Sequence, residues 1–286
     1  MKKALWVLLI FCAGLSIHQA HANDSLNFVK AKWKVEKVSK GIKLYTFHFN
    51  QENLFQSNQY ISYVVFNNKR NGRKAGIGAD PKLLKTTSNF ATASNADVAV
   101  NGNFFDMRNG GAVAYTKKDG IVINTNKITG NQRAFHQKAA VVIEDGCLQI
   151  KNWDGSDNWE AKLTESDVML TGPLLIFNSA SEKLDSSSSF TITRHPRTCV
   201  GTTRSGNVIM LIADGRNANA RGLNLFELAN VMKWLGCVNA VNFDGGGSSA
   251  LWVKGRGVVN HPSDNGKWNH EGERKVANIL LVKPRE

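Results

Sequence analysis

The sequence predicts an α/β fold of the mixed α+β kind: one sheet-rich domain with at least one parallel strand–helix–strand crossover and several hairpins. Two features lead to this prediction. Apolar and alternating stretches of strand length, separated by turn residues, recur along most of the chain. Near the C-terminal end, a strand pattern, a helix pattern and a second strand pattern follow one another at lengths that suit a right-handed crossover between parallel strands.

The N-terminal half reads as strands, a loop, a helix and a hairpin. Residues 41–49 and 60–66 alternate and are rich in aromatic and β-branched side chains, which is typical of strands. We expect a polar, glycine-bearing loop over 67–78 and a helix over 82–93. Further on, 139–150 has two apolar runs around an Asp-Gly turn, which indicates a hairpin.

The C-terminal half supplies the crossover. Residues 207–213 form a continuous apolar run of strand length, and 240–243 form another. Between them, the apolar residues of 225–235 recur at the helical period of 3.6 residues. Asn224 stands at the N-cap with Glu227 three places on, a capping-box arrangement, so a structural role is one interpretation of Glu227.

Polar residues follow three of the expected strands. Asp214 and Asp244 each follow one strand of the crossover, and Asn101 follows a short buried strand at 97–100. The two strands of a parallel crossover end at the same edge of a sheet, where ligands bind. We therefore expect Asp214 and Asp244 on one rim, with Asn101 as a third contribution.

Three glycines and a serine follow Asp244, namely Gly245, Gly246, Gly247 and Ser248. Glycine permits left-handed backbone conformations and close approach, and consecutive exposed N–H groups form a nest that binds anions. A tight sheet corner that needs glycine for steric reasons is the alternative interpretation. A lone carboxylate would repel an anion in this nest, so it is expected to have a role of its own. It could hold a metal, take up a proton, or act on a carbon next to the anion.

Residues 1–22 are expected to be a secretory signal peptide, because two lysines precede an apolar run and small residues precede a cleavage position after Ala22. The remaining 23–286 would form a single domain, periplasmic or secreted, with no stable membrane insertion. The chain carries 36 Lys and Arg against 23 Asp and Glu, a net charge of +13, and loss of Lys2 and Lys3 with the leader leaves +11. This charge suits an acidic partner such as a membrane surface or a phosphate-containing glycan, and because the basic residues are scattered, nucleic acid is not the expected partner. A solvated basic surface without a specific partner is the alternative interpretation.

No cofactor motif is evident in the sequence. The mature chain keeps Cys147, Cys199 and Cys237, of which one pair could bridge in an oxidising compartment, with Cys199 and Cys237 as the candidate pair. No Cys/His cluster has the spacing of a zinc site. A single divalent cation near Asp244 stays an open alternative.

Several segments in a fixed order resemble the phosphodiester glycosidase family. The matching segments are 101–105, 171–173, 197–198, 214–216, 222–229, 235–237, 242–249, 259–262 and 274–278. The resemblance covers roughly 97–282 and leaves 23–95 as a variable N-terminal part. Asn103 stands where the family's Asn-Gly-Gly-Phe-Phe element has glycine, and Lys275 stands where proline is common.

The resemblance implies an exported hydrolase that cleaves the glycosidic C–O bond of an N-acetylglucosamine-like sugar 1-phosphodiester in envelope or extracellular polysaccharide. Sugar and a phosphomonoester would be released. Because this leaving group is a weak base, the reaction mainly needs charge stabilisation at the phosphate and a carboxylate near the anomeric carbon. The catalytic candidates are Asp244 as nucleophile or base, Asp214 as its partner, and Glu227. The candidates for substrate and phosphate binding are Asn101, Asn103, Arg197, Arg216, Gly245, Gly246, Gly247 and Ser248.

Two other functions remain as alternatives. A non-catalytic envelope protein that binds anionic glycans would need the basic surface and the glycines, but no paired carboxylates. A metal-dependent phosphodiesterase would cleave the P–O bond and would need a His/Asp metal cluster, which the sequence does not show. Some residues keep two interpretations: Asn101 and Asn103 as sugar ligands or turn caps, His195 and His261 as loop residues or catalysts, and Trp252 and Trp268 as sugar platforms or core.

Overall fold

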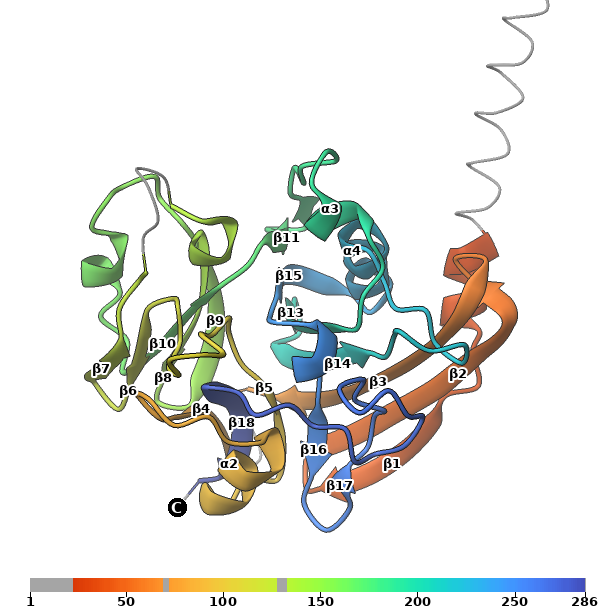
Figure 1. Cartoon of the computed structure of the whole chain (residues 1–286), viewed down its shortest axis with the longest axis horizontal. Helices are drawn as coiled ribbons and strands as arrows, with labels where there is room; N and C mark the ends of the chain where they lie inside the picture. Colours follow the sequence, from red (N-terminus) through yellow and green to blue (C-terminus); the bar gives the residue numbers. More distant parts are fainter. Residues whose placement is uncertain (1–22, 69–71, 128–132, 286) are drawn as a thin grey trace, which may run out of the picture.

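The computed structural model describes residues 23–68, 72–127 and 133–285, which fold into three antiparallel β-sheets with short helices beside them (Figure 1). The expected signal peptide, 1–22, lies outside the described residues. Residues 23–29 form a short helix that precedes the first strand. Among the described residues, no helix has both the length and the apolar character that crossing a bilayer requires.

The largest sheet has eight strands, and its first three form a long curved ribbon at one side of the molecule (Figure 1). In spatial order the strands are β1 (Lys34–Ser39), β2 (Ile42–Leu54), β3 (Ser57–Asn67), β14 (Asn207–Ala213), β13 (Arg197–Thr203), β15 (Cys237–Asn242), β11 (Leu174–Phe177) and β12 (Ala180–Ser181). The expected N-terminal strands are confirmed as the β2–β3 hairpin, in which Ile42 pairs with Phe66.

The other two sheets have five strands each. One contains β7 (Ile121–Asn124), β6 (Thr116–Lys118), β10 (Asp167–Thr171), β8 (Ala139–Glu144) and β9 (Cys147–Asn152), in that order, and β8–β9 is the predicted hairpin. The other contains β17 (Gly257–Val258), β16 (Leu251–Val253), β5 (Val98–Asn101), β18 (Asn278–Pro284) and β4 (Arg73–Ala79).

The helices are short. They are α2 (Thr87–Ala93), α3 (Ser189–Ile192) and α4 (Leu225–Trp234), with 3₁₀ turns η1 (Phe135–Gln137), η2 (Trp159–Lys162) and η3 (Gly246–Ser248). Helix α4 is the predicted helix, and the predicted capping box is present: the Asn224 side chain accepts from the Glu227 N–H, and Glu227 accepts from the Asn224 N–H. Leu225, Leu228 and Met232 bury its apolar face.

The predicted α/β class and its parallel crossover are wrong, because the described residues form three antiparallel sheets with only short helices. Every strand pair in the described residues is antiparallel, and β14 and β15, the strands that α4 connects, are separated by β13. The continuous apolar run of β14 reflects burial on both faces rather than parallel pairing, because alternate residues enter two different core clusters. Since both β14 and β15 oppose β13, they still run in the same direction and end at the same edge.

The expected loop over 67–78 is also partly wrong, because strand β4 begins at Arg73. The glycines of this segment favour a loop in the sequence, but Gly76 and Gly78 lie inside the strand. A Cβ at Gly78 would lie 2.8 Å from the Ile279 side chain of the neighbouring strand β18. The glycine therefore lets two strands pack closely, which is one of the uses of glycine inside a sheet.

One apolar cluster draws on all three sheets. It contains Val64 and Val200 from the first sheet, Val141 from the second, and Val98 and Leu280 from the third, all essentially inaccessible to solvent. The ends of β5, β13, β14 and β15 surround this cluster, so the strand-end loops that follow are anchored on a rigid support.

The three cysteines that lie in the described part of the chain are free thiols. Cys147, Cys199 and Cys237 form no disulfide, so the candidate bridge between Cys199 and Cys237 is not present. Burial raises the pKa of both the Cys199 and the Cys237 thiol, the latter to about 12. Both sulfurs are therefore protonated and poorly reactive in the folded protein.

Candidate active site

The Asp244 loop leaves strand β15 and is tied to the end of strand β5. The Asp244 N–H donates to the Gly102 carbonyl at 3.2 Å, and Asn101 Nδ2 donates to the Asp244 carbonyl at 2.7 Å. The Gly245 N–H donates to Asp244 Oδ1 at 2.9 Å, which fixes the carboxylate against its own backbone. The structure thus brings Asn101 and Asp244 together at one edge.

A buried chain of hydrogen bonds links this loop to Asp214. Thr198 Oγ1 donates to Asn101 Oδ1 at 2.7 Å and lies 3.2 Å from Ser249 Oγ. Asn260 Nδ2 donates to the Ser249 carbonyl at 3.1 Å and to Asp214 Oδ1 at 2.8 Å. The ends of β5, β13, β14 and β15 are therefore held in one network, which orders the site before any ligand binds.

Two arginines pack on the bare backbone of the glycine run. A Cβ at Gly246 would lie 2.9 Å from Arg216 Nη2, and a Cβ at Gly247 would lie 2.5 Å from Arg274 Nη2. Arg274 is held by an ion pair with Asp264 at 2.5 Å. The exposed Arg216 has a left-handed backbone, with φ 62, which is uncommon for a residue other than glycine and is a strain found at functional sites.

The electrostatics of the site centre on Asp244. Burial raises the pKa of its carboxyl from 3.8 to about 6. The Ser248 hydroxyl, the Gly245 N–H and the positive charges of Arg274 and Arg216 act in the opposite direction and favour the ionised form. The carboxylate is thus mostly ionised at neutral pH, with a pKa close enough to pH 7 for proton transfer.

Asp214 makes a different set of contacts. Its side chain is almost fully buried, and Oδ2 accepts from the His261 N–H at 2.9 Å and lies 2.8 Å from His261 Nδ1. The His261 ring is stacked between Trp268, at 3.7 Å between centroids, and His270, at 4.6 Å. With Oδ1 bound to Asn260, Asp214 orients a histidine and a loop rather than facing open solvent.

Arg197 also differs from its predicted role. Only 1% of the residue is exposed, Nε donates to the Leu223 carbonyl at 2.9 Å, and Nη2 donates to the carbonyls of Phe190 and Thr193. Burial and the charge of Arg216 lower the pKa of Arg197 to about 10. Two of its three nitrogens are used by main-chain carbonyls, so the structure assigns it to holding loops.

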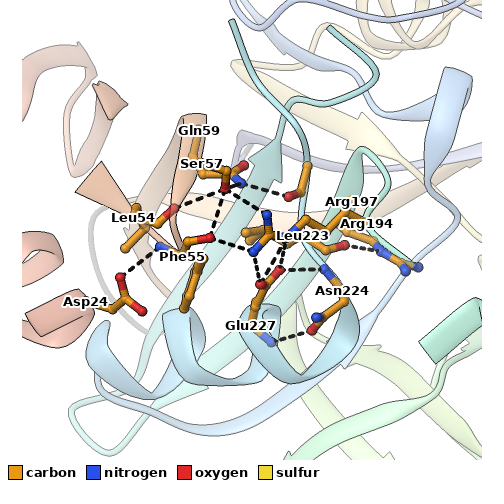
Figure 2. A network of polar contacts seen from close by, with 11 residues as sticks. Asp24, Leu54, Phe55, Ser57, Gln59, Arg194, Arg197, Leu223, Asn224 and Glu227 are labelled. Atoms are coloured by element: carbon orange, nitrogen blue, oxygen red, sulfur yellow. Dashed lines mark hydrogen bonds and ion pairs between the residues drawn. The ribbon is translucent and has the colours of Figure 1, made fainter. Parts of the chain in front are cut away.

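Glu227 lies in a separate network on helix α4 (Figure 2). Arg194 Nε contacts both Glu227 carboxylate oxygens at 3.0 Å, and the same guanidinium donates to Ser57 Oγ and to the Phe55 carbonyl. The Glu227 carboxylate also accepts from the Asn224 N–H at 3.0 Å. This carboxylate joins the helix cap to the β2–β3 hairpin, and it makes no hydrogen bond with Asp244 or Asp214.

Asn103 is buried among protein partners. Its Nδ2 donates to Thr116 Oγ1 and to the Leu170 carbonyl, and its Oδ1 accepts from Asn278 Nδ2 at 2.7 Å. The side-chain atoms of Asn101 are likewise occupied within the network described above. Of the predicted binding residues, Arg216, Gly245, Gly246, Gly247 and Ser248 are those that the structure gathers around the Asp244 carboxylate.

Sequence reasoning missed Arg274, Asn260 and the orientation of His261. All three lie in the loop and strand segment that follows β17, where no regular periodicity or motif marks them. The only available signal was the resemblance of 259–262 and 274–278 to family segments. Across the described residues, no group of three or more His, Cys, Asp and Glu side chains could hold a metal ion.

Fold and site together define a protein built of antiparallel sheets, with an ionisable aspartate and two arginines gathered on a glycine-rich strand end. The sequence profile of the phosphodiester glycosidase family matches residues 94–283. This chain belongs to the phosphodiester glycosidase family.

Relatives with known names agree with this assignment. The chain is 29% identical over 214 residues to mouse N-acetylglucosamine-1-phosphodiester alpha-N-acetylglucosaminidase, an alignment that covers 72% of this chain and 41% of the mouse protein. The chain thus spans well under half the length of that curated relative.

Solved structures share the fold. The catalytic domain of the zebrafish N-acetylglucosamine-1-phosphodiester alpha-N-acetylglucosaminidase, auto-inhibited by its pro-peptide, matches with a TM-score of 0.67 at 19% identity, covering 90% of this chain and 89% of that one. A hypothetical protein from Synechocystis matches with a TM-score of 0.66 at 16% identity, covering 88% and 64%. At these identities the likeness shows a common fold.

Proposed function

We propose that this protein hydrolyses the glycosidic C–O bond of a sugar 1-phosphodiester, with an N-acetylglucosamine-like sugar, and releases the sugar and a phosphomonoester. The family assignment supports this reaction. The observation that carries it is the position of the Asp244 carboxylate, which lies within the field of two arginines that pack on the adjacent glycines. An anion and a carboxylate-dependent reaction centre can be accommodated side by side only where such positive charge is present.

Arg216 suits the phosphate, and Arg274 adds positive charge beside it. Guanidinium groups recognise phosphate oxygens through paired hydrogen bonds, and Arg216 is an exposed residue whose guanidinium lies beside Gly246. Arg274 is paired with Asp264, and the hydrogen bond that it donates to that carboxylate raises the pKa of Arg274. The backbone N–H groups of the glycine run add further donors at the same place. Together these groups stabilise the charge that develops on the departing phosphate.

Asp244 acts at the anomeric carbon. Its ionised carboxylate attacks C1 or activates the water that does so, and the C1–O bond breaks with its electron pair going to the phosphate oxygen. Water supplies the hydroxyl group at C1 and the proton for the phosphomonoester. Because the leaving group is a weak base, the reaction needs no strong acid on that side. Asp214 acts as a positioning residue, through His261 and Asn260.

The decisive experiment incubates the purified mature chain with a synthetic α-N-acetylglucosamine 1-phosphodiester in ¹⁸O-labelled water, with and without chelator. Label in the reducing sugar, seen by mass spectrometry and NMR, means C–O cleavage and supports the proposal. Label in the phosphate, with sugar 1-phosphate as product, means P–O cleavage by a phosphodiesterase. Binding without any product in wild type and Asp244→Asn alike would instead identify a glycan-binding protein.

We propose in addition that the protein is exported and acts on envelope or extracellular polysaccharide. The N-terminal sequence pattern and the net positive charge support this location. The expected result is that mass spectrometry of the cell-envelope or extracellular fraction finds a chain beginning at Asn23. A full-length chain confined to the cytoplasm would contradict the proposal.

A further inference from the structure

A hollow of about 540 Å³ lies beyond the Asp244 loop, between η1, the segment after β9, the start of β11 and helix α3. Its lining includes three aromatic rings: Phe135, Trp153 and Phe190. This volume falls within the range of ordinary ligand sites, which combine apolar and aromatic walls with a few polar groups. We call this hollow the aromatic groove.

The rings of the aromatic groove are partly open to solvent. Phe135 is 42% exposed, although its ring lies only 4.8 Å from that of Phe190. Phe104 packs edge-on against Phe135 at 5.9 Å and so supports it from behind. An aromatic side chain that is held in place by other rings, yet exposed on one face, is a preformed surface for a ligand with an apolar face.

The aromatic groove is connected to the candidate active site through contacts of two of its rings, Phe135 and Phe190. Phe104 stands two residues after Gly102, whose carbonyl binds the Asp244 N–H. On the other side, Arg197 lies over the Phe190 ring at 4.7 Å, and the preceding residue, Pro196, accepts from the Gly246 N–H at 2.8 Å. The segment that contains Phe190 and Pro196 therefore lines the groove and also binds the glycine run, and Phe104 links a ring of the groove to the loop that holds Asp244.

The polar lining of the aromatic groove has balanced charge. Lys138 and Lys183 stand against Glu182 and Asp185, and Asn152 adds a neutral amide. A strongly charged ligand gains little from such a lining, whereas a neutral ligand rich in hydroxyl groups can donate to the carboxylates and accept from the lysines. Pyranose rings combine such hydroxyl groups with an apolar face of C–H bonds.

We propose that the aromatic groove binds a neutral oligosaccharide, namely the sugar chain on the far side of the phosphodiester that is cleaved. The ligand class rests on the proposed function, because that function places a glycan at the adjoining site. Phe135 provides the exposed ring on which a sugar stacks, and the groove then determines which phosphodiesters in a polymer are cleaved rather than how fast the bond breaks.

The kinetic test compares two synthetic N-acetylglucosamine 1-phosphodiesters, one with a methyl group and one with a neutral tetrasaccharide on the far side of the phosphate. We expect Phe135→Ala to raise KM for the tetrasaccharide diester about 10-fold and to leave kcat and both constants for the methyl diester unchanged. The matched control is Phe226→Ala on helix α4, since Phe226 is 41% exposed and lies outside the groove. Equal effects of the two variants would overturn the proposal.

A binding test separates this proposal from the proposed reaction. Tryptophan fluorescence is titrated with β-1,4-linked N-acetylglucosamine tetramer and with a glucose tetramer, and the signal of Trp153 is identified by comparison with Trp153→Phe. A saturable change that Phe135→Ala weakens and Phe226→Ala retains supports the groove even if no diester is hydrolysed. No saturable change with either oligosaccharide, together with KM values that do not depend on the tetrasaccharide, would contradict it.

Discussion

The Asp244 loop and the Glu227 network both combine a carboxylate with arginine, but the hydrogen bonds of the arginines differ between the two regions. Each has a carboxylate next to an arginine, on a segment that resembles the family. In the Glu227 network, Arg194 donates to the Glu227 carboxylate, to Ser57 Oγ and to the Phe55 carbonyl (Figure 2). These hydrogen bonds leave Arg194 few donors for a ligand.

At Asp244, Arg216 and Arg274 pack on glycine instead, and their charge acts on the Asp244 carboxylate without a direct hydrogen bond among the described residues. Arg274 already donates to Asp264 from Nε and Nη2, so the contrast in free donors concerns Arg216.

The difference lies in which donors are already consumed. An arginine whose nitrogens bind main-chain carbonyls and a carboxylate stabilises the fold, whereas an arginine that faces solvent above bare backbone is free to bind an anion. The same criterion separates Arg197, which is buried and bound to carbonyls, from the exposed Arg216. Four predictions test whether this criterion assigns the roles correctly.

The largest effect is expected for Asp244→Asn. Loss of the carboxylate should lower kcat on the N-acetylglucosamine 1-phosphodiester by about 10²- to 10⁴-fold, as is typical when a catalytic acid or base is removed. Steady-state kinetics measures this, with Asp157→Asn, at an exposed position, as the charge control. Activity within 10-fold of wild type would mean that another group carries the reaction.

Arg216→Ala should weaken the anion site while the fold stays intact, because the side chain is exposed. We expect kcat/KM to fall by about 10- to 100-fold, the equivalent of one or two charge-assisted hydrogen bonds. Because Arg216 favours the ionised form of Asp244, the acid limb of the pH–rate profile should also move to higher pH. Arg204→Ala, at an exposed turn, is the control, and an equal loss in both variants would remove Arg216 from the site.

Glu227→Gln should act on stability instead. It weakens a charge-assisted pair with Arg194, so we expect the free energy of unfolding to fall by about 1 to 3 kcal/mol with kcat nearly unchanged. Chemical denaturation and kinetics on the same preparation measure both, and Glu52→Gln at an exposed position serves as control. A stable variant with a large loss of kcat would make Glu227 a catalytic residue and would break the comparison.

The smallest effect concerns the dependence of stability on pH. Burial raises the pKa of Asp244 in the folded state from 3.8 to about 6, so the folded state binds more protons than the unfolded state between these values. The contribution of this group to stability therefore falls as pH rises through that window. Relative to wild type, Asp244→Asn should gain about 1 to 3 kcal/mol between pH 4 and pH 7.5. If the difference in the free energy of unfolding between Asp244→Asn and wild type does not change with pH, burial does not destabilise the ionised Asp244 carboxylate.

The elements of the fold were predictable where local periodicity fixes them. Strand β14, helix α4 with its cap and the β8–β9 hairpin all follow from patterns within about ten neighbouring residues. The direction of strand pairing was not predictable, because β13, which forms a hairpin with β14 immediately after it in the sequence, also pairs with β15 and so lies between the two expected neighbours. A run of buried apolar residues says how a strand is covered, but not which strand lies beside it.

The site was predictable to a similar extent. An aspartate followed by three glycines is a recognisable pattern in the sequence, and Asp244 does lie at a strand end beside an exposed arginine. The role of Arg197 was not visible, since no local pattern shows that the Phe190, Thr193 and Leu223 carbonyls will take its donors. Arg274 was missed for the converse reason: it reaches Gly247 from a loop segment with no pattern of its own.

The contacts of Gly246 and Gly247 bear on how this family can vary. An alanine at Gly246 would meet the Arg216 guanidinium and would also strain a left-handed backbone with φ 63, whereas an alanine at Gly247 would meet the Asp264–Arg274 ion pair. At both positions, the place of the neighbouring arginine therefore depends on the glycine. In a homologue without the Asp264–Arg274 ion pair, the Gly247 position could therefore hold a larger residue, whereas the Gly246 position would keep glycine for its backbone even without Arg216.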